Sequence, residues 1–300
     1  MKILVTGAFG QLGSSLLRKF EKSKKEIIAL DKRKKNEFSN VKEIITEITK
    51  IENLKKYKEE LKDVTTLIHL ASYITNDRDV IKSGPESIKL NIVGTINLLN
   101  YLPNLKNISF TSSYMVYGTP TKKIINENHP TNPNVVYGAS KLATEKYLQI
   151  FSKESGIKLS ILRMMGIYGV EKPHGQAIPT FIKLISENQN PIIFGTGNEK
   201  RNHLHIDDAT DSIINSIKQK KTGIYNIGGK DTPSNLEVIE KINSIMNKKI
   251  APKFKKSKNI SYDFITDISK ARNELLFEPR VSIDDGIRDT IKQYQKNKWQ

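Results

Sequence analysis

The first half of the sequence alternates between short apolar runs and longer amphipathic stretches, and this alternation limits the folds open to the chain. The apolar runs are rich in Ile, Val and Leu and lie near residues 2–6, 26–30, 41–45, 65–71, 106–111 and 158–163. The amphipathic stretches cover residues 12–20, 51–61, 88–101 and about 136–155. Strands that alternate with helices form βαβ units, in which the strands are parallel and covered on both faces. We therefore predict an α/β fold built on a doubly wound parallel sheet.

After Arg163 this rhythm ends. Glycine, proline and polar residues become frequent, for example at Gly166, Gly169 and Pro179, and helices no longer alternate regularly with strands. We expect a first domain over residues 1–165, which a segment at about 204–222 rejoins. A smaller lobe of mixed structure is expected over residues 166–300.

Composition argues against several classes of protein. No apolar run approaches the roughly 20 residues that span a bilayer, and the chain opens on a strand-like segment without a signal peptide. Because cysteine is absent, disulfides and thiolate metal sites are excluded, and we expect a metal-free cytoplasmic protein. The formal net charge of +17 comes mostly from dispersed lysines with few aromatic neighbours. We expect a solvated surface that favours an anionic substrate, and no nucleic-acid or membrane partner.

A glycine-rich turn follows directly on the first predicted strand. Gly7, Gly10 and Gly13 have the spacing that permits a tight turn, close approach of backbone to a pyrophosphate, and close packing of helix on strand. The following helix presents free N–H groups and the positive end of its dipole to the phosphates. This pattern predicts a Rossmann-type dinucleotide site in the first domain.

Asp31 ends the second predicted strand and sets the expected cofactor. Its carboxylate can accept hydrogen bonds from both adenosine ribose hydroxyls and repels a 2′-phosphate, which favours NAD. Four basic residues, Lys32 to Lys35, follow at once. A side chain from that run, with Lys32 as the first candidate, could pair with a 2′-phosphate, so NADP stays open as an alternative.

Tyr137 and Lys141 open a predicted helix at i, i+4 spacing, which places both on one face, one turn apart. A phenol has a pKa near 10, and bringing it toward 7 requires roughly 4 kcal/mol. A neighbouring ammonium and a positive nicotinamide ring could supply this by stabilising the phenolate. Ser113 lies at the C-terminal end of the strand that contains the apolar run 106–111, at the sheet edge where ligands gather. Its hydroxyl can bind the reacting oxygen. The three residues form a candidate site for proton transfer.

These motifs and several others resemble the extended short-chain dehydrogenase/reductases, the NAD-dependent epimerase/dehydratase family typified by UDP-glucose 4-epimerase. The resemblance covers nearly the whole chain. Beyond Thr6 to Gly13 and Tyr137 to Lys141, it rests on His69–Ser72, Asn91–Thr95, Ser112–Gly118, Arg201–Asp208, Tyr225–Gly228, Asp267–Ala271 and Phe277–Pro279. The set is specific to the superfamily and says little about the reaction.

The resemblance implies a role for each matching position. Ser113, Tyr137 and Lys141 would form the catalytic triad. The cofactor would be held by the glycine turn and by residues near the adenine, under the dinucleotide and around the nicotinamide, namely Gly7, Phe9, Gly10, Gln11, Leu12, Gly13, Asp31, Lys32, Glu47, Ile48, Leu70, Ala71, Ser72, Asn91, Ser112, Tyr137, Lys141 and Met164. The substrate would be held by Ser113, Tyr137, Gly166 and Arg201, and the arginine would reach a diphosphate.

Two positions depart from the family pattern. Members usually carry Asn at the position of Gly166, where its amide contacts the nucleotide sugar, and glycine cannot supply that amide. The 4,6-dehydratases carry Asp–Glu for acid/base work on the sugar where this chain has Tyr114 and Met115, so dehydration is disfavoured. His203 and His205 have the spacing of a metal pair without a third ligand, and Asp207–Asp208 fits a helix N-terminus better than a catalytic pair.

The function expected from the resemblance is a nucleotide-sugar 4-epimerase that oxidises the sugar transiently on tightly bound NAD. The resemblance also implies a homodimer built from the helices around 88–101 and 136–155. A nucleotide-4-keto-sugar reductase and an L-threonine 3-dehydrogenase-like enzyme remain open, although Arg201 weighs against a substrate without a diphosphate. A non-catalytic dinucleotide-binding or RNA-associated protein is the third hypothesis, which the intact Ser–Tyr–Lys set disfavours.

Overall fold

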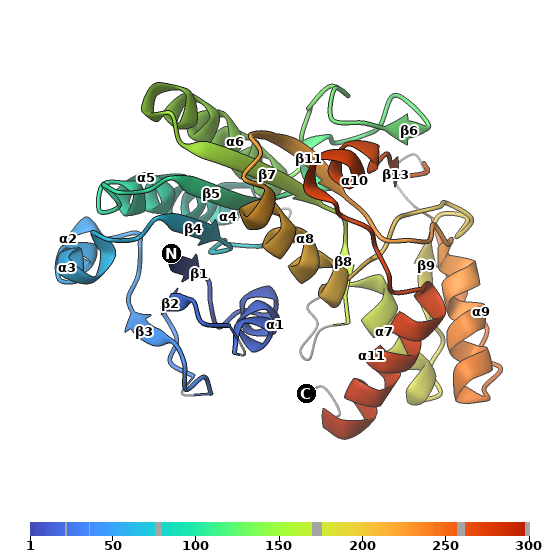
Figure 1. Cartoon of the computed structure of the whole chain (residues 1–300). Helices are drawn as coiled ribbons and strands as arrows, with labels where there is room; N and C mark the ends of the chain where they lie inside the picture. Colours follow the sequence, from blue (N-terminus) through green and yellow to red (C-terminus); the bar gives the residue numbers. More distant parts are fainter. Residues whose placement is uncertain (22, 36, 76–79, 170–175, 257–261, 298–300) are drawn as a thin grey trace.

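The computed structural model describes residues 1–21, 23–35, 37–75, 80–169, 176–256 and 262–297. Its centre is a seven-stranded sheet in the order β11-β7-β5-β4-β1-β2-β3, in which every pairing is parallel (Figure 1). The strands are β1 (Lys2–Thr6), β2 (Glu26–Asp31), β3 (Lys42–Ile45), β4 (Thr66–His69), β5 (Asn107–Ser113), β7 (Lys158–Met164) and β11 (Gly223–Ile227). The predicted doubly wound α/β fold is confirmed.

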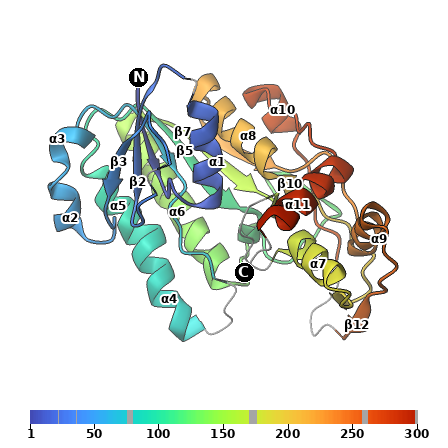
Figure 2. The ribbon, with the colours of Figure 1, turned by 90° about the horizontal axis from the view of Figure 1, so that it is seen from below.

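Helices cover both faces of the sheet (Figure 2). Along β1, Ile3 and Val5 face a core that contains Leu16 of α1 (Gln11–Phe20), whereas Leu4 faces the opposite core. That second core is closed by α2 (Ile51–Lys55), α3 (Lys58–Leu61), α5 (Gly94–Leu99) and α6 (Val136–Ser155). Because both faces are buried, the strands read as continuous apolar runs in the sequence.

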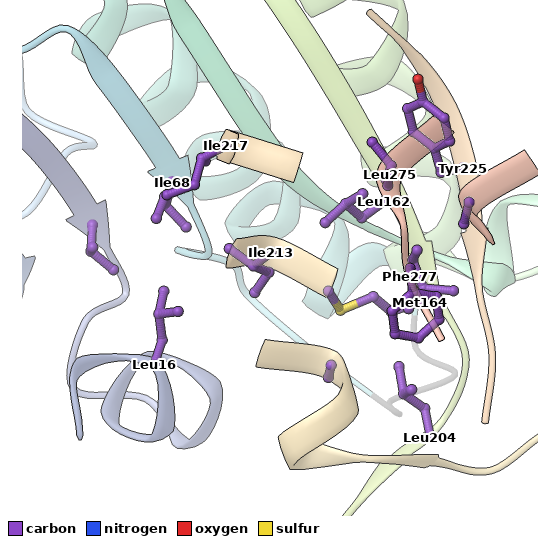
Figure 3. Close-up of a cluster of buried hydrophobic side chains, with 14 of the residues drawn as sticks. Leu16, Ile68, Leu162, Met164, Leu204, Ile213, Ile217, Tyr225, Leu275 and Phe277 are labelled. Atoms are coloured by element: carbon purple, nitrogen blue, oxygen red, sulfur yellow. The ribbon is translucent and has the colours of Figure 1, made fainter. Parts of the chain in front are cut away.

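The chain returns to the sheet after entering the second lobe. Helix α8 (Ile206–Gln219) packs on α1, β5 and β7, and β11 then adds the seventh strand beside β7. Figure 3 shows Ile217 of α8 beside Ile68 of β4, with Ile213 of α8, Leu16 of α1 and Leu275 of α10 (Ser269–Leu275) in the same core. Helix α8 and β11 thus continue the central layer of the fold through Ile227.

A second lobe has a core of its own. Three helices meet there: α7 (Ala177–Ser186), α9 (Asn235–Met246) and α11 (Ile283–Asn297). Their apolar faces bury Ile182, Ile239 and Ile287 completely or nearly so. Three short parallel pairs complete the fold: β8 (Ile167–Tyr168) with β10 (Leu204–His205), β9 (Ile192–Phe194) with β12 (Lys253–Lys255), and β6 (Ile124–Ile125) with β13 (Ile265–Thr266).

Two predicted helices have different bounds in the structure. The stretch 51–61 is divided into α2 and α3, because the backbone N–H of Tyr57 donates to the carbonyl oxygen of Leu54 and closes a tight turn between the two helices. The helix expected from residue 88 already begins at residue 80: α4 (Val80–Ile88) accommodates Pro85 and continues through a π-helical turn, Lys89–Val93, into α5. Within the described part of the chain, every helix is too short or too polar to cross a bilayer.

Candidate active site

The glycine turn lies between the end of β1 and the start of α1. Gly7 has a φ of 64°, and a Cβ there would lie 2.8 Å from the backbone nitrogen of Ala71. A Cβ on Gly13 would lie 2.4 Å from the carbonyl oxygen of Gly7. Both positions therefore require glycine, one for its left-handed conformation and the other for the close contact of helix with turn. Gly10 precedes α1 with extended backbone, so the first N–H groups of the helix face the turn.

Gln11, the first residue of α1, carries a buried side-chain nitrogen that makes no hydrogen bond to the residues the structure describes. A buried unsatisfied donor costs about 1–3 kcal/mol, so such a group calls for an acceptor. Phosphate oxygens at a helix N-terminus would supply it. Leu12, the next residue, is half-buried and packs against the sheet core instead. The donors and the glycine cradle together fit a dinucleotide pyrophosphate.

Asp31 ends β2 beside this turn and is 5% exposed. Its carboxylate accepts hydrogen bonds from the backbone N–H groups of Phe9 and Arg33, each at 3.0 Å. The guanidinium of Arg33 also donates to it, through Nε at 3.1 Å and Nη2 at 3.3 Å. The basic side chain that reaches Asp31 is therefore Arg33, while Lys32 is exposed. Phe9 itself is buried, and its ring stacks on Phe38.

The end of β4 forms the floor of the site. Ala71 and Leu70 lie against the glycine turn, where the hydroxyl of Thr6 accepts from the backbone N–H of Ala71 at 3.2 Å. Below them the imidazole of His69 lies 2.7 Å from the Thr6 hydroxyl and 2.8 Å from the Thr95 hydroxyl. Complete burial lowers the pKa of His69 to about 3, so the ring is neutral at physiological pH. This structural histidine holds β1, β4 and α5 in register.

Asn91 lies inside the π-helical turn, the kind of distortion that often marks a functional site. Its Oδ1 accepts from the backbone N–H of Tyr73 at 2.7 Å and from the hydroxyl of Ser72 at 3.1 Å. Its Nδ2 donates to Ser140 at 2.8 Å. The amide thereby ties the segment after β4 to α6, the helix that carries the tyrosine and the lysine.

Helix α6 holds Tyr137 and Lys141 one turn apart, as predicted, and buries both against the carboxyl end of β5. Gly138 makes this approach possible, because a Cβ there would lie 2.5 Å from the carbonyl oxygen of Met115. The Nζ of Lys141 donates to the carbonyl oxygen of Thr111 at 2.7 Å and lies 5.8 Å from the centre of the Tyr137 ring. Ser113 accepts from the backbone N–H of Met115 at 3.2 Å, which leaves its own hydrogen free to donate.

Burial sets the protonation states of the tyrosine and the lysine. Burial raises the pKa of Tyr137 to about 12, although the nearby Ser72 hydroxyl lowers it in part. Burial also lowers the pKa of Lys141 to about 7, against an opposing effect from Glu145. The two groups are desolvated together, and the ammonium donates to a backbone carbonyl. The protein alone therefore does not bring the pKa of the phenol toward 7.

A buried ion pair beneath the site went unnoticed in the sequence. Glu145 is fully buried, and it binds Arg163 through two hydrogen bonds, 2.7 Å from Nη2 and 3.1 Å from Nε. The hydroxyl of Ser112 also donates to Glu145, so this serine points into the interior and not toward the reacting groups. A usable signal was present: Glu145 lies four residues after Lys141 on the same helix face, and Arg163 directly follows the apolar residues Ile161 and Leu162 in a strand.

On the substrate side, Arg201 lies among aromatic side chains. Its guanidinium is 5.7 Å from the centre of the Tyr262 ring, and its charge acts against the burial that raises the pKa of Tyr114. Tyr114 is also close enough to Tyr137 to raise the pKa of that phenol. Tyr114 packs edge-on against Phe264 at 4.9 Å between ring centres. Tyr114 therefore interacts both with the cation at Arg201 and with the candidate catalytic phenol.

Four other predicted positions lie at the edges of this arrangement. Met164, at the end of β7, is buried and pairs in register with Ser113. Gly166 follows two residues later, and a Cβ built on it meets no atom within 4 Å. Glu47 is exposed, whereas Ile48 is buried and packs against Gly94. The place of Gly166 is therefore open at the end of the sheet.

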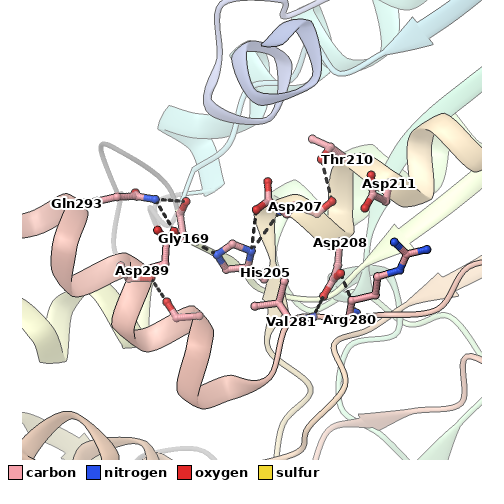
Figure 4. Close-up of polar contacts among 12 residues, drawn as sticks. Gly169, His205, Asp207, Asp208, Thr210, Asp211, Arg280, Val281, Asp289 and Gln293 are labelled. Atoms are coloured by element: carbon pink, nitrogen blue, oxygen red, sulfur yellow. Dashed lines mark hydrogen bonds and ion pairs between the residues drawn. The ribbon is translucent and has the colours of Figure 1, made fainter. Parts of the chain in front are cut away.

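The paired histidines and aspartates downstream are held in structural contacts. Figure 4 shows His205 between Asp207 and Asp289, with ring nitrogen to carboxylate distances of 3.7 and 3.6 Å. Asp208 accepts from the backbone N–H groups of Arg280 and Val281. Among the described residues, no cluster of three His, Cys, Asp or Glu side chains has the arrangement of a metal site. Asp208 thus anchors the segment that leads into α11, whereas Asp207 lies beside His205.

Comparison with known proteins places these features in a family. Residues 3–228 match the model of the NAD dependent epimerase/dehydratase family. A protein of Methanocaldococcus jannaschii, provisionally named a UDP-glucose 4-epimerase, is 32% identical over 98% of this chain and 99% of its own length. A dTDP-D-glucose 4,6-dehydratase of Dictyostelium discoideum is 33% identical over 81% of this chain and 62% of its own length. The crystal structure of UDP-glucuronic acid 4-epimerase from Bacillus cereus, with UDP-glucuronic acid and NAD, aligns with a TM-score of 0.89 at 27% identity over 99% of both chains.

Proposed function

This chain belongs to the NAD dependent epimerase/dehydratase family, and from that premise we propose that it is an NAD-dependent 4-epimerase of a nucleoside-diphosphate sugar. One observation carries the proposal. Tyr137 and Lys141 are held one turn apart on α6, next to the end of β5, in a site that also contains the glycine turn. The epimerase relatives with UDP-sugars make a UDP-hexose the first substrate to test.

The dinucleotide would be held by this chain's own groups along the edge of the sheet. The turn at Gly7, Gly10 and Gly13 and the amide of Gln11 fit the pyrophosphate, and Asp31 fits the adenosine ribose. A bound NAD would supply the acceptor for a hydride from the sugar C4 and the donor for its return to the resulting ketone. All other work falls to the side chains around that carbon.

Tyr137 removes the proton from the sugar 4-hydroxyl and later gives it back. Bringing its pKa from about 12 to near 7 requires about 7 kcal/mol of phenolate stabilisation. Lys141 contributes a positive charge one turn away, and a bound nicotinamide ring would contribute a second. Ser113 has its hydrogen free to bind the same sugar oxygen and to stabilise the charge that develops on it.

The residues after Ser113 argue against dehydration. A 4,6-elimination needs an acid and a base at the sugar in addition to the tyrosine, and Met115 has no ionisable group. Burial raises the pKa of Tyr114 above its ordinary value, which makes it a weak acid. Arg201 fits the diphosphate, because a guanidinium presents paired donors to phosphate oxygens in a partly apolar cleft.

We divide the molecule into a dinucleotide domain, residues 1–165 with the returning segment, and a substrate lobe from the rest of 166–300.

We also propose a homodimer through α4, the π-helical turn and α6. Val80, Ile81, Ile88 and Val93 are 41–87% exposed and line one apolar groove, and Ile150 of α6 is 65% exposed. A continuous exposed apolar face of this kind marks an interaction site. Light scattering should give twice the mass of 34.1 kDa, and Ile81→Lys should lower it.

The deciding experiment offers UDP-glucose, UDP-glucuronic acid and the matching dTDP-, GDP- and CDP-sugars to the protein with a catalytic amount of NAD. We expect interconversion of C4 epimers with no net change in NADH absorbance. A requirement for stoichiometric NAD(P)H would identify a reductase, and a 4-keto-6-deoxy product would identify a dehydratase. Tyr137→Phe should lose at least about 100-fold in kcat, and full activity in that variant would refute the proton-transfer role.

A further inference from the structure

The carboxylate of Asp31 is already engaged by a cation from its own chain. In an NAD site this carboxylate would repel a 2′-phosphate, because the two groups carry like charges at short range. Here the guanidinium of Arg33 lies on it through two hydrogen bonds, at 3.1 and 3.3 Å. The pair is neutral overall, so the electrostatic basis for excluding a phosphorylated ribose is largely cancelled.

The orientation of the ion pair matters as much as its charge. The side chain of Asp31 is 4% exposed, whereas that of Arg33 is 59% exposed, so the positive member faces outward. An arginine has five N–H donors, and the two contacts with Asp31 use two of them. The remaining donors are in the plane of a guanidinium that can bind phosphate oxygens bidentately.

The position of Arg33 relative to the glycine turn completes the site. Its Nη2 lies 3.7 Å from the place that a Cβ of Gly10 would occupy. A second cation lies at the same corner, because Nζ of Lys35 donates to the hydroxyl of Ser14 in the first turn of α1 at 3.3 Å. Lys35 is partly neutralised by Glu37 at 2.8 Å, so it supports Arg33 and does not replace it.

We propose that Arg33, supported by Lys35, forms a binding site for the 2′-phosphate of an adenine dinucleotide, so that the protein accepts NADP(H) as well as NAD(H). The inference rests on the proposed function only in that a dinucleotide binds along the glycine turn. When NAD is bound, the ribose hydroxyls share Asp31 with Arg33. When NADP is bound, Arg33 bridges the carboxylate and the phosphate and offsets their repulsion.

Adenosine nucleotides that lack the nicotinamide test this corner alone. We would measure the affinity of the full-length protein for 5′-AMP and for adenosine 2′,5′-bisphosphate, and then for NAD and NADP, by titration calorimetry. Arg33→Met keeps the aliphatic stem and removes the charge. Lys34→Ala is the matched control, since it removes one charge from the same exposed run. Thermal melting of each variant checks that it folds.

In the wild-type protein we expect NADP to bind within about tenfold of NAD. Arg33→Met should weaken the 2′-phosphorylated ligands roughly 10- to 100-fold, while 5′-AMP and NAD change by less than about threefold, and Lys34→Ala should change neither class. If Arg33→Met changed the affinity for both ligand classes equally, or changed neither, the proposal would be overturned. Normal NAD binding with such a result leaves the epimerase proposal standing, whereas no binding of any adenine nucleotide removes both.

Discussion

The buried ion pair between Glu145 and Arg163 offers a sharp test of how the catalytic helix is held. Glu145 is 0% exposed and Arg163 is 2% exposed, so solvent screens neither charge. Replacing Glu145 by Gln preserves the shape of the side chain and removes its charge. It also turns one acceptor into an amide that faces the guanidinium. Arg163 then remains charged and buried without a counterion.

Leaving one member of a buried ion pair unpaired costs about 3–5 kcal/mol. Contacts of Arg163 with the carbonyl oxygen of Glu127 and with the face of the Tyr117 ring place the expected cost toward the lower end. An unfolding entropy of about 2.1 cal/mol/K per residue gives about 0.6 kcal/mol/K for 300 residues. The melting temperature of Glu145→Gln should therefore fall by about 5–6 °C.

Urea and thermal unfolding of the wild type and the variant measure this loss. Glu154→Gln is the matched control, because Glu154 is exposed on the same helix and its replacement should change stability by less than about 0.5 kcal/mol. The double variant Glu145→Met/Arg163→Met should lose less stability than Glu145→Met or Arg163→Met alone, since it leaves no buried charge unpaired. A loss below about 1 kcal/mol in Glu145→Gln, or simple addition of the two single losses, would refute the reasoning.

Four further predictions follow from burial and local geometry. The pKa of His69 is about 3 in the folded protein, so the unfolded chain binds more protons below pH 6.5. Stability should then fall as the pH drops from about 6.5 toward 3, by about 2–3 kcal/mol at pH 4.5. Urea midpoints at pH 7 and 4.5 should show this loss in the wild type and a smaller one in His69→Gln. Lys141→Met removes a buried ammonium and should raise the urea midpoint at pH 6 while lowering kcat at least about 100-fold; a lower midpoint would contradict the burial argument. Gly13→Ala would place a Cβ 2.4 Å from a backbone oxygen, so it should lower the stability of the protein. It should also weaken NAD binding at least about tenfold in titration calorimetry, and normal affinity would count against the glycine cradle. Gly166→Asn should leave the melting temperature within about 1–2 °C of wild type while changing KM for the nucleotide sugar, because open space surrounds that position.

Several features were predictable because they depend on local order along the chain. The strand–turn–helix at Gly7 to Gly13, the one-turn spacing of Tyr137 and Lys141, and α6 itself all follow from periodicity and glycine placement. The parallel sheet followed from the alternation of apolar runs and amphipathic stretches. Helix bounds were less predictable, since Pro85 reads as a helix breaker but is tolerated inside α4.

The tertiary structure decided which polar side chains meet. Sequence spacing could not show that Ser112 points toward Glu145, or that Arg33, and not Lys32, reaches the carboxylate of Asp31. It also could not show that Tyr137 and Lys141 are buried together, which raises the pKa of the tyrosine and lowers that of the lysine. Hydrophobic periodicity is a property of neighbouring residues, so the sequence reveals it directly. Desolvation and ion pairing depend on residues brought together from distant elements, and only the folded chain specifies them.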